Sequence, residues 1–91
     1  MMQEQLTRPE QLYIVAQFRQ EMTEKGFLNE RIRRCGAIAE RVVREYPDLD
    51  LPYDIDIVAR KIAGPEKIPR QIRNLRNAIR QFYVFLGKEC W

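Results

Sequence analysis

The chain has 91 residues, of which 45% are apolar and 32% charged, with a formal net charge of +3. This length suits one domain, here residues 1–91, and no apolar run is long enough to cross a membrane. The chain contains no histidine, which excludes histidine-based nucleophile pairs and most zinc sites, so we expect a non-enzymatic protein without a cofactor or metal.

The first predicted helix covers residues 8–25. Thr7 and Glu10 have the spacing of a capping box, and Gly26 is a natural stop. The apolar side of this helix recurs at intervals of three and four: Leu12, Val15, Phe18 and Met22. The segment before it lacks the basic start and apolar stretch of a signal peptide, so we expect a cytoplasmic protein.

The second predicted helix covers residues 29–46 and has one narrow apolar stripe: Leu28, Ile32, Cys35, Ala39, Val42 and Tyr46. Arginines lie roughly opposite this stripe, interleaved with glutamates that can neutralise them along the helix. We expect Cys35 in the core and Cys90 as a free thiol, because a disulfide between them is disfavoured in the cytosol.

The connector that follows, residues 48–57, allows two interpretations. Its apolar residues alternate with mostly acidic ones, which is a strand pattern, but Pro52 interrupts it and no partner strand is evident. We favour a short helix over residues 54–63 that packs inward through Ile55, Val58, Ala59 and Ile62. The dense acidic cluster, Asp48, Asp50, Asp54 and Asp56, lacks the glycine and closing glutamate of an EF-hand, so a solvated acidic loop is favoured over a metal site.

The last predicted helix covers residues 69–86 and has two stripes. Its apolar stripe consists of Ile68, Ile72, Leu75, Ile79, Phe82 and Leu86. The neighbouring stripe consists of Arg70, Arg73, Arg76 and Arg80. Guanidinium groups bind phosphate with two parallel hydrogen bonds, so the second stripe predicts a DNA-binding face, and a solvated amphipathic helix is the alternative.

Charge and side-chain chemistry in this region suit the same prediction. Residues 60–91 carry eight basic and two acidic residues, a net charge of +6, whereas residues 48–59 carry four acidic and no basic residues. Asn77 lies beside Arg73 and Arg80 and could contact base edges, but ordinary surface polarity is the favoured interpretation. Tyr83 or Trp91 could stack on bases, but core packing is the favoured role for these aromatics.

Two segments resemble a known family. Residues 73–88, RNLRNAIRQFYVFLGK, are similar to the end of the final helix in the core-binding (SAM-like) domain of tyrosine recombinases, the phage-integrase family. Residues 54–58, DIDIV, are similar to the acidic start of that domain's short helix, and the resemblance covers about residues 28–88.

The resemblance implies an all-α, SAM-like bundle of four helices that clamps duplex DNA through its last helix. It places the DNA contacts on Arg70, Arg73, Asn77 and Arg80, with Arg76 nearer the packing edge. Arg33 and Arg34 are weaker candidates for DNA contact. The chain departs from the family in its opening helix, where Arg31, Ile32 and Cys35 stand in place of a threonine and tyrosine. The family's catalytic domain, with its histidine and nucleophilic tyrosine, is also missing, so DNA cutting and joining are not implied.

The alternative is a small regulatory protein, of the kind found in phages and mobile elements, that does not bind nucleic acid. Such a protein would dock a protein partner through the acidic segment 48–56. The salt dependence of DNA binding distinguishes the two functions.

Overall fold

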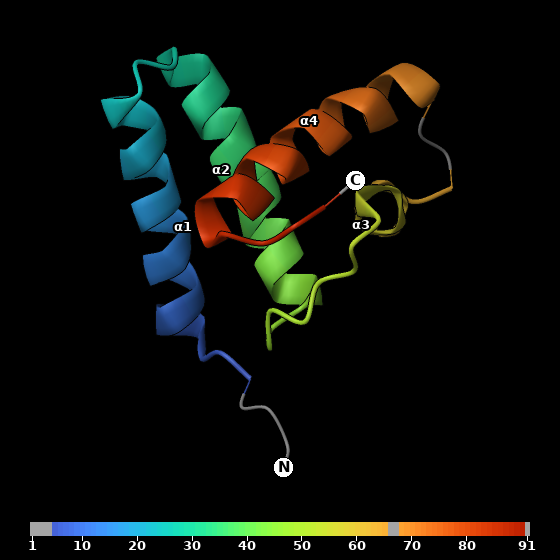
Figure 1. Ribbon diagram of the computed structural model, residues 1–91, viewed down its shortest axis with the longest axis horizontal. Coiled ribbons are helices and arrows are strands. Elements are labelled where there is room, and N and C mark those ends of the chain that lie inside the picture. Colours follow the sequence, from blue (N-terminus) through green and yellow to red (C-terminus); the bar gives the residue numbers. More distant parts are fainter. Residues whose placement is uncertain (1–4, 66–67, 91) are drawn as a thin grey trace.

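The computed structural model describes residues 5–65 and 68–90, and within these ranges the chain forms four helices and no strand (Figure 1). The helices are α1 (Arg8–Glu24), α2 (Asn29–Glu45), α3 (Ile55–Ala63) and α4 (Pro69–Leu86). The predicted all-α bundle of four helices is therefore confirmed. None of these helices combines the length and apolarity needed to cross a lipid bilayer.

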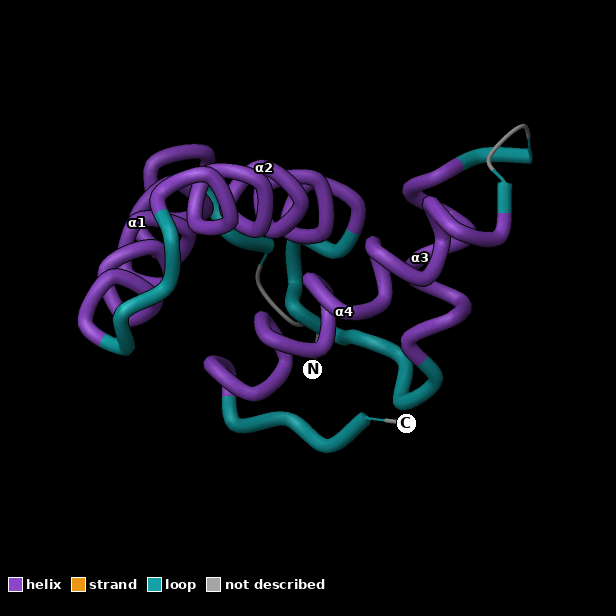
Figure 2. The backbone as a smooth tube through the Cα atoms, turned by 90° about the horizontal axis from the view of Figure 1, so that it is seen from above, coloured by secondary structure: helices purple, strands orange, loops and turns teal. Residues whose placement is uncertain are grey.

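The helices form two layers. α1 and α2 lie side by side, and α4 crosses α2 so that its C-terminal half also reaches α1 (Figure 1). Figure 2 shows α4 beneath the α1–α2 pair, with α3 packed against α4 away from α1. This crossing leaves the first turns of α4 at the edge of the molecule.

The core is built from the apolar stripes of all four helices. Val15, Phe18 and Met22 of α1 are buried, as is the predicted inward face of α3. Phe18 contacts two aromatic rings of α4, at centroid distances of 5.1 Å to Phe82 and 5.4 Å to Phe85. These contacts fix the position of α4 relative to α1.

Three residues predicted to lie on apolar stripes are instead exposed. Leu12 is 44% exposed, Leu28 is 79% exposed and Ile68 is 55% exposed, so their assignment to the stripes was wrong. Leu28 and Ile68 are the N-caps of α2 and α4, and they precede the buried parts of these helices. Leu12 lies near the start of α1, on the edge of the stripe formed by Val15 and Met22.

The N-terminal cap of α1 forms as the sequence predicts. Thr7 and Glu10 form a capping box, in which the backbone N–H of Thr7 donates to Oε1 of Glu10 at 2.9 Å. This hydrogen bond lowers the pKa of Glu10 below its ordinary value. The α1 helix therefore begins at a defined residue, which sets the register of its buried face.

The connector between α2 and α3 is a loop rather than a strand. Leu49 has a positive φ of 57°, which ends the extended pattern, and Leu49 and Leu51 pack against the core. The side chain of Asp54 caps α3 by accepting a hydrogen bond from the backbone N–H of Asp56 at 2.9 Å. The alternation of apolar and acidic residues therefore does not mark a strand. It arises because two leucines of the loop turn toward the core and an aspartate caps the following helix.

Candidate nucleic-acid interface

The N-terminal half of α4 stands out from the core. Pro69 occupies the first turn, and Gln71 accepts a hydrogen bond from the backbone N–H of Ile68 at 3.4 Å, so the helix begins without a serine or aspartate cap. No residue from Pro69 to Asn77 is fully buried, whereas Ala78 and Ile79 are. The first half of the helix therefore presents most of its surface to solvent.

Three arginines of this helix lie on its exposed side. Arg70, Arg73 and Arg80 are exposed, and Arg73 and Arg80 are separated by about 10 Å along the helix axis, at 1.5 Å per residue. Among the described residues, no carboxylate forms an ion pair with any of them. Asn77 is also exposed and lies between them on the helix surface. We call Arg70, Arg73, Asn77 and Arg80 the outer face of α4.

Arg76 differs from the outer face. Its Nε lies 3.0 Å from Oδ1 of Asp56 on α3, and both side chains are partly buried at 39% and 36% exposure. Arg76 thus lies at the packing edge between α3 and α4, with its charge matched inside the fold. We therefore separate it from the arginines that remain open to a ligand.

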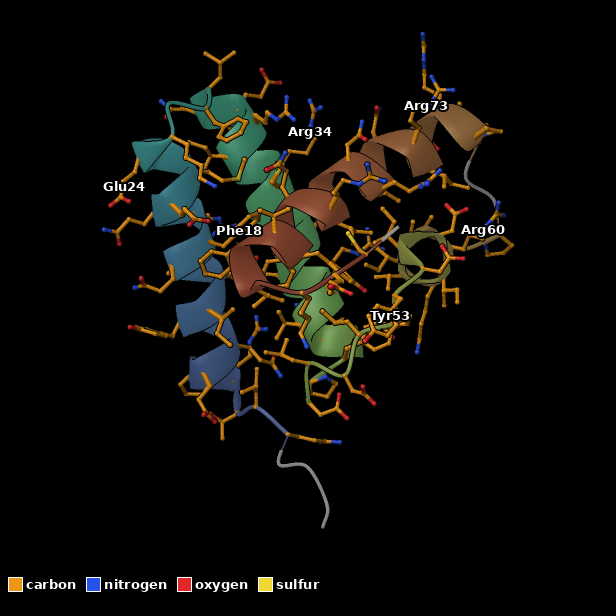
Figure 3. All side chains as sticks on the ribbon, viewed as in Figure 1. Phe18, Glu24, Arg34, Tyr53, Arg60 and Arg73 are labelled. Atoms are coloured by element: carbon orange, nitrogen blue, oxygen red, sulfur yellow. The ribbon has the colours of Figure 1, made fainter. Side chains whose placement is uncertain are left out.

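Arg33 and Arg34 lie on different sides of α2, because consecutive helical residues are about 100° apart. Arg34 extends from α2 on the side of α4, whereas Arg73 extends away from the molecule near the start of α4 (Figure 3). Arg34 pairs with Glu30 at 3.7 Å and lines a depression of about 240 Å³ together with Asn77. Arg33 does not line this depression, so the structure does not bring the two arginines to one site. Both belong to α2, so we separate them from the outer face of α4.

The sequence prediction missed a groove between α2 and α4. Two adjoining depressions share Arg34 and Asn74, and together they form what we call the α2–α4 groove. The α2 wall consists of Arg31, Arg34 and Arg41 together with Glu30. The α4 wall consists of Gln71, Asn74 and Asn77. The three arginines share one side of a 3.6-residue helix, which is a signal in the sequence, but only the crossing of α4 shows what faces them.

Tyr83 is not available to stack on a nucleic-acid base. It is fully buried, and its hydroxyl donates to the backbone carbonyl of Pro52 at 2.5 Å. Burial raises the pKa of this phenol well above its ordinary value. The favoured core role of Tyr83 is therefore confirmed and the stacking interpretation is wrong, while Trp91 lies outside the described residues.

The two cysteines are free thiols in this structure. Cys35 is buried at the floor of the groove, as expected for a core residue. Burial raises the pKa of its thiol, and the nearby positive charges of Arg31 and Arg34 oppose that rise. The buried thiol is thus kept protonated near neutral pH, which makes it a poor nucleophile.

The acidic cluster of the connector is largely used within the fold. Asp48 accepts a hydrogen bond from the backbone N–H of Asp50 at 3.0 Å, Asp54 caps α3, and Asp56 pairs with Arg76. In the described part of the chain, no three histidine, cysteine, aspartate or glutamate side chains gather as a metal site would require.

No protein-family model, curated protein or solved structure matches the chain. The resemblance to a recombinase core-binding domain therefore rests on the two sequence segments, and any function is argued from the geometry of the site.

Proposed function

We propose that this protein is a non-catalytic DNA-binding module that contacts duplex DNA through the outer face of α4. The observation that carries the proposal is the set of exposed arginines, Arg70, Arg73 and Arg80, on one side of a helix that stands out from the core. No described carboxylate neutralises them. The resemblance to the integrase core-binding domain supports the same face, and it suggests a role in DNA recombination or in a mobile element.

Phosphate contacts explain how such a face would work. Each guanidinium can bind a backbone phosphate with two hydrogen bonds, and the positive end of the α4 dipole adds to the attraction near Arg70. Binding of this kind positions a protein on DNA with little dependence on sequence. Asn77, in the middle of the face, is the residue that could add a preference for particular bases.

The fold lends less support to a protein partner at segment 48–56. Three of its four aspartates already accept hydrogen bonds or form an ion pair within the chain: Asp48, Asp54 and Asp56. A partner with basic residues would compete with these contacts. We therefore retain duplex DNA as the proposed ligand.

Fluorescence anisotropy with labelled random-sequence duplex DNA tests the proposal. We expect wild-type binding that weakens as salt rises, with a log–log slope of about −0.9 for each phosphate neutralised. The double variant Arg73→Ala/Arg80→Ala lacks two phosphate-binding groups, so the slope should become shallower by about 1.8 and binding should weaken at every salt concentration.

Two variants serve as controls. Arg33→Ala/Arg44→Ala removes the same charge from exposed positions of α2 that do not line the α2–α4 groove, and it should bind DNA like the wild type. Arg76→Ala should lose some stability with Asp56 unpaired, but should keep the wild-type salt slope. Absence of DNA binding at low salt, or equal losses in both double variants, would contradict the proposal.

A further inference from the structure

The α2 wall of the α2–α4 groove is a row of three positioned guanidinium groups. Arg31 lies over the ring of Phe27, 5.2 Å from its centroid. Nη2 of Arg41 donates to the backbone carbonyl of Ile62 at 2.6 Å, and Arg34 is held by the exposed Glu30. The row spans about 15 Å along the helix axis, at 1.5 Å per residue. An anionic ligand would therefore meet donors that are already partly ordered.

The α4 wall has a different chemistry. Gln71, Asn74 and Asn77 recur every three residues and carry primary amides, which both donate and accept hydrogen bonds. The floor between the walls is apolar and includes Ile38 and Leu75. The groove therefore combines a wall of three arginines and Glu30, which is cationic on balance, with one neutral amide wall and an apolar base.

This combination suits an acidic peptide better than a nucleic-acid strand. An extended peptide needs partners for both its N–H and C=O groups, which amide side chains supply, whereas phosphates only accept hydrogen bonds. An apolar floor can take alternate apolar side chains, since successive residues of an extended strand point to opposite sides. Among the described residues, no aromatic side chain lines either depression, so these walls offer a base no surface on which to stack.

We infer that the α2–α4 groove binds an extended acidic peptide from a partner protein, about five residues long, in which acidic and apolar residues alternate. The length follows from the 15 Å arginine row and a rise of about 3.3 Å per extended residue. The apolar side chains point to the floor, and the carboxylates point to the rim of the groove, where Arg31, Arg34 and Arg41 are exposed. The peptide backbone bonds the amides of α4. The arginines of the outer face stay free, because Arg73 and Arg80 do not line the groove, whereas Asn77 borders both surfaces.

The test is an anisotropy titration of the full chain with a labelled peptide that alternates aspartate and leucine. A peptide that alternates asparagine and leucine is the uncharged control. We expect the aspartate peptide to bind more tightly, and Arg31→Ala/Arg34→Ala to weaken its binding about tenfold for each arginine removed. The amide signals of Asn74 and Gln71 in a nuclear magnetic resonance titration should shift with the aspartate peptide.

A crossed comparison separates this inference from the proposed DNA function. Arg31→Ala/Arg34→Ala should lose peptide binding and retain binding of duplex DNA. Arg73→Ala/Arg80→Ala should lose binding of duplex DNA and retain peptide binding. The charge-matched Arg33→Ala/Arg44→Ala variant should keep both ligands, and helical circular dichroism should show that all variants fold. The inference would be overturned if the two peptides bound equally well. It would also be overturned if a single-stranded oligonucleotide bound more tightly than the aspartate peptide and lost that binding in Arg31→Ala/Arg34→Ala.

Discussion

At the residue scale, one hydroxyl connects α4 to the connector that precedes α3. The Tyr83 hydroxyl is buried and donates to the carbonyl of Pro52, which has no partner in a regular helix. Removing this donor would leave a carbonyl without its partner at the edge of the core. The bond therefore helps to hold the irregular connector in place.

This contact predicts a loss of stability in alkaline solution. The folded-state pKa of Tyr83 is raised by burial, so the folded chain keeps its phenolic proton at a pH where the unfolded chain releases it. The contribution is intact below the ordinary tyrosine pKa of about 10, and the free energy of unfolding should fall above it by up to about 1.4 kcal/mol per pH unit.

Urea unfolding of wild type and Tyr83→Phe, from neutral pH to above pH 10, measures this loss. Tyr83→Phe should be less stable at neutral pH by about 1 kcal/mol but should lack this part of the alkaline decline. Tyr13→Phe is the control, because Tyr13 is 65% exposed and should leave the decline unchanged. A decline of the same size in Tyr83→Phe would show that another group causes it.

Individual residues show how far the sequence alone could go. Val15, Phe18 and Ile79 were placed correctly, since each lies on a stripe that a 3.6-residue period defines without knowledge of any neighbour. The groove arginines Arg31 and Arg41 were not singled out, because their site exists only where α4 crosses α2. That crossing depends on side-chain packing between segments far apart in the sequence, which a local pattern does not encode.

At the element scale, the position of one arginine side chain between α1 and α2 depends on a glycine. The Arg19 side chain of α1 lies across Gly36, where a Cβ atom would come within 2.0 Å of the arginine Nε. The Arg19 guanidinium also pairs with Glu40 at 3.7 Å, but its Nε is buried without a hydrogen-bond partner. Gly36 thus leaves room for the Arg19 side chain, which forms an ion pair but has one buried N–H group without a hydrogen-bond partner.

The variant Gly36→Ala should displace Arg19 with little net change in stability. Alanine is favoured over glycine within a helix by about 1 kcal/mol, and this gain offsets the loss of Arg19 packing and its ion pair. In an Arg19→Ala background the three atoms nearest to the new methyl group are removed, so a larger gain should appear. A double-mutant cycle in urea checks this, and a smaller gain in the Arg19→Ala background than in wild type would contradict it.

At the scale of the whole molecule, an aromatic cluster joins the two layers. Phe18 of α1 contacts Phe82 and Phe85 of α4, and these two rings stack on each other at 6.1 Å. Other direct contacts between α1 and α4 are few. The cluster is therefore the main link between the first helix and the last.

Truncation of Phe18 should destabilise the entire fold. Phe18→Ala leaves a cavity that typically costs about 3–5 kcal/mol, which is most of the stability of a small domain. Thermal and urea unfolding measure the loss. Leu12→Ala is the control, because this half-exposed residue should change stability by only about 0.5 kcal/mol. A similar cost for both variants would mean that the cluster does not link the layers.

The arrangement of helix contacts also has a consequence for folding kinetics. The most extensive contacts join α1 to α2 and α3 to α4, which are neighbours along the chain. Such local pairs close short loops, so we expect folding on a timescale on the order of microseconds to milliseconds. The α2–α4 groove forms only when the two pairs dock. A ligand that occupies it would therefore slow unfolding much more than it would accelerate folding.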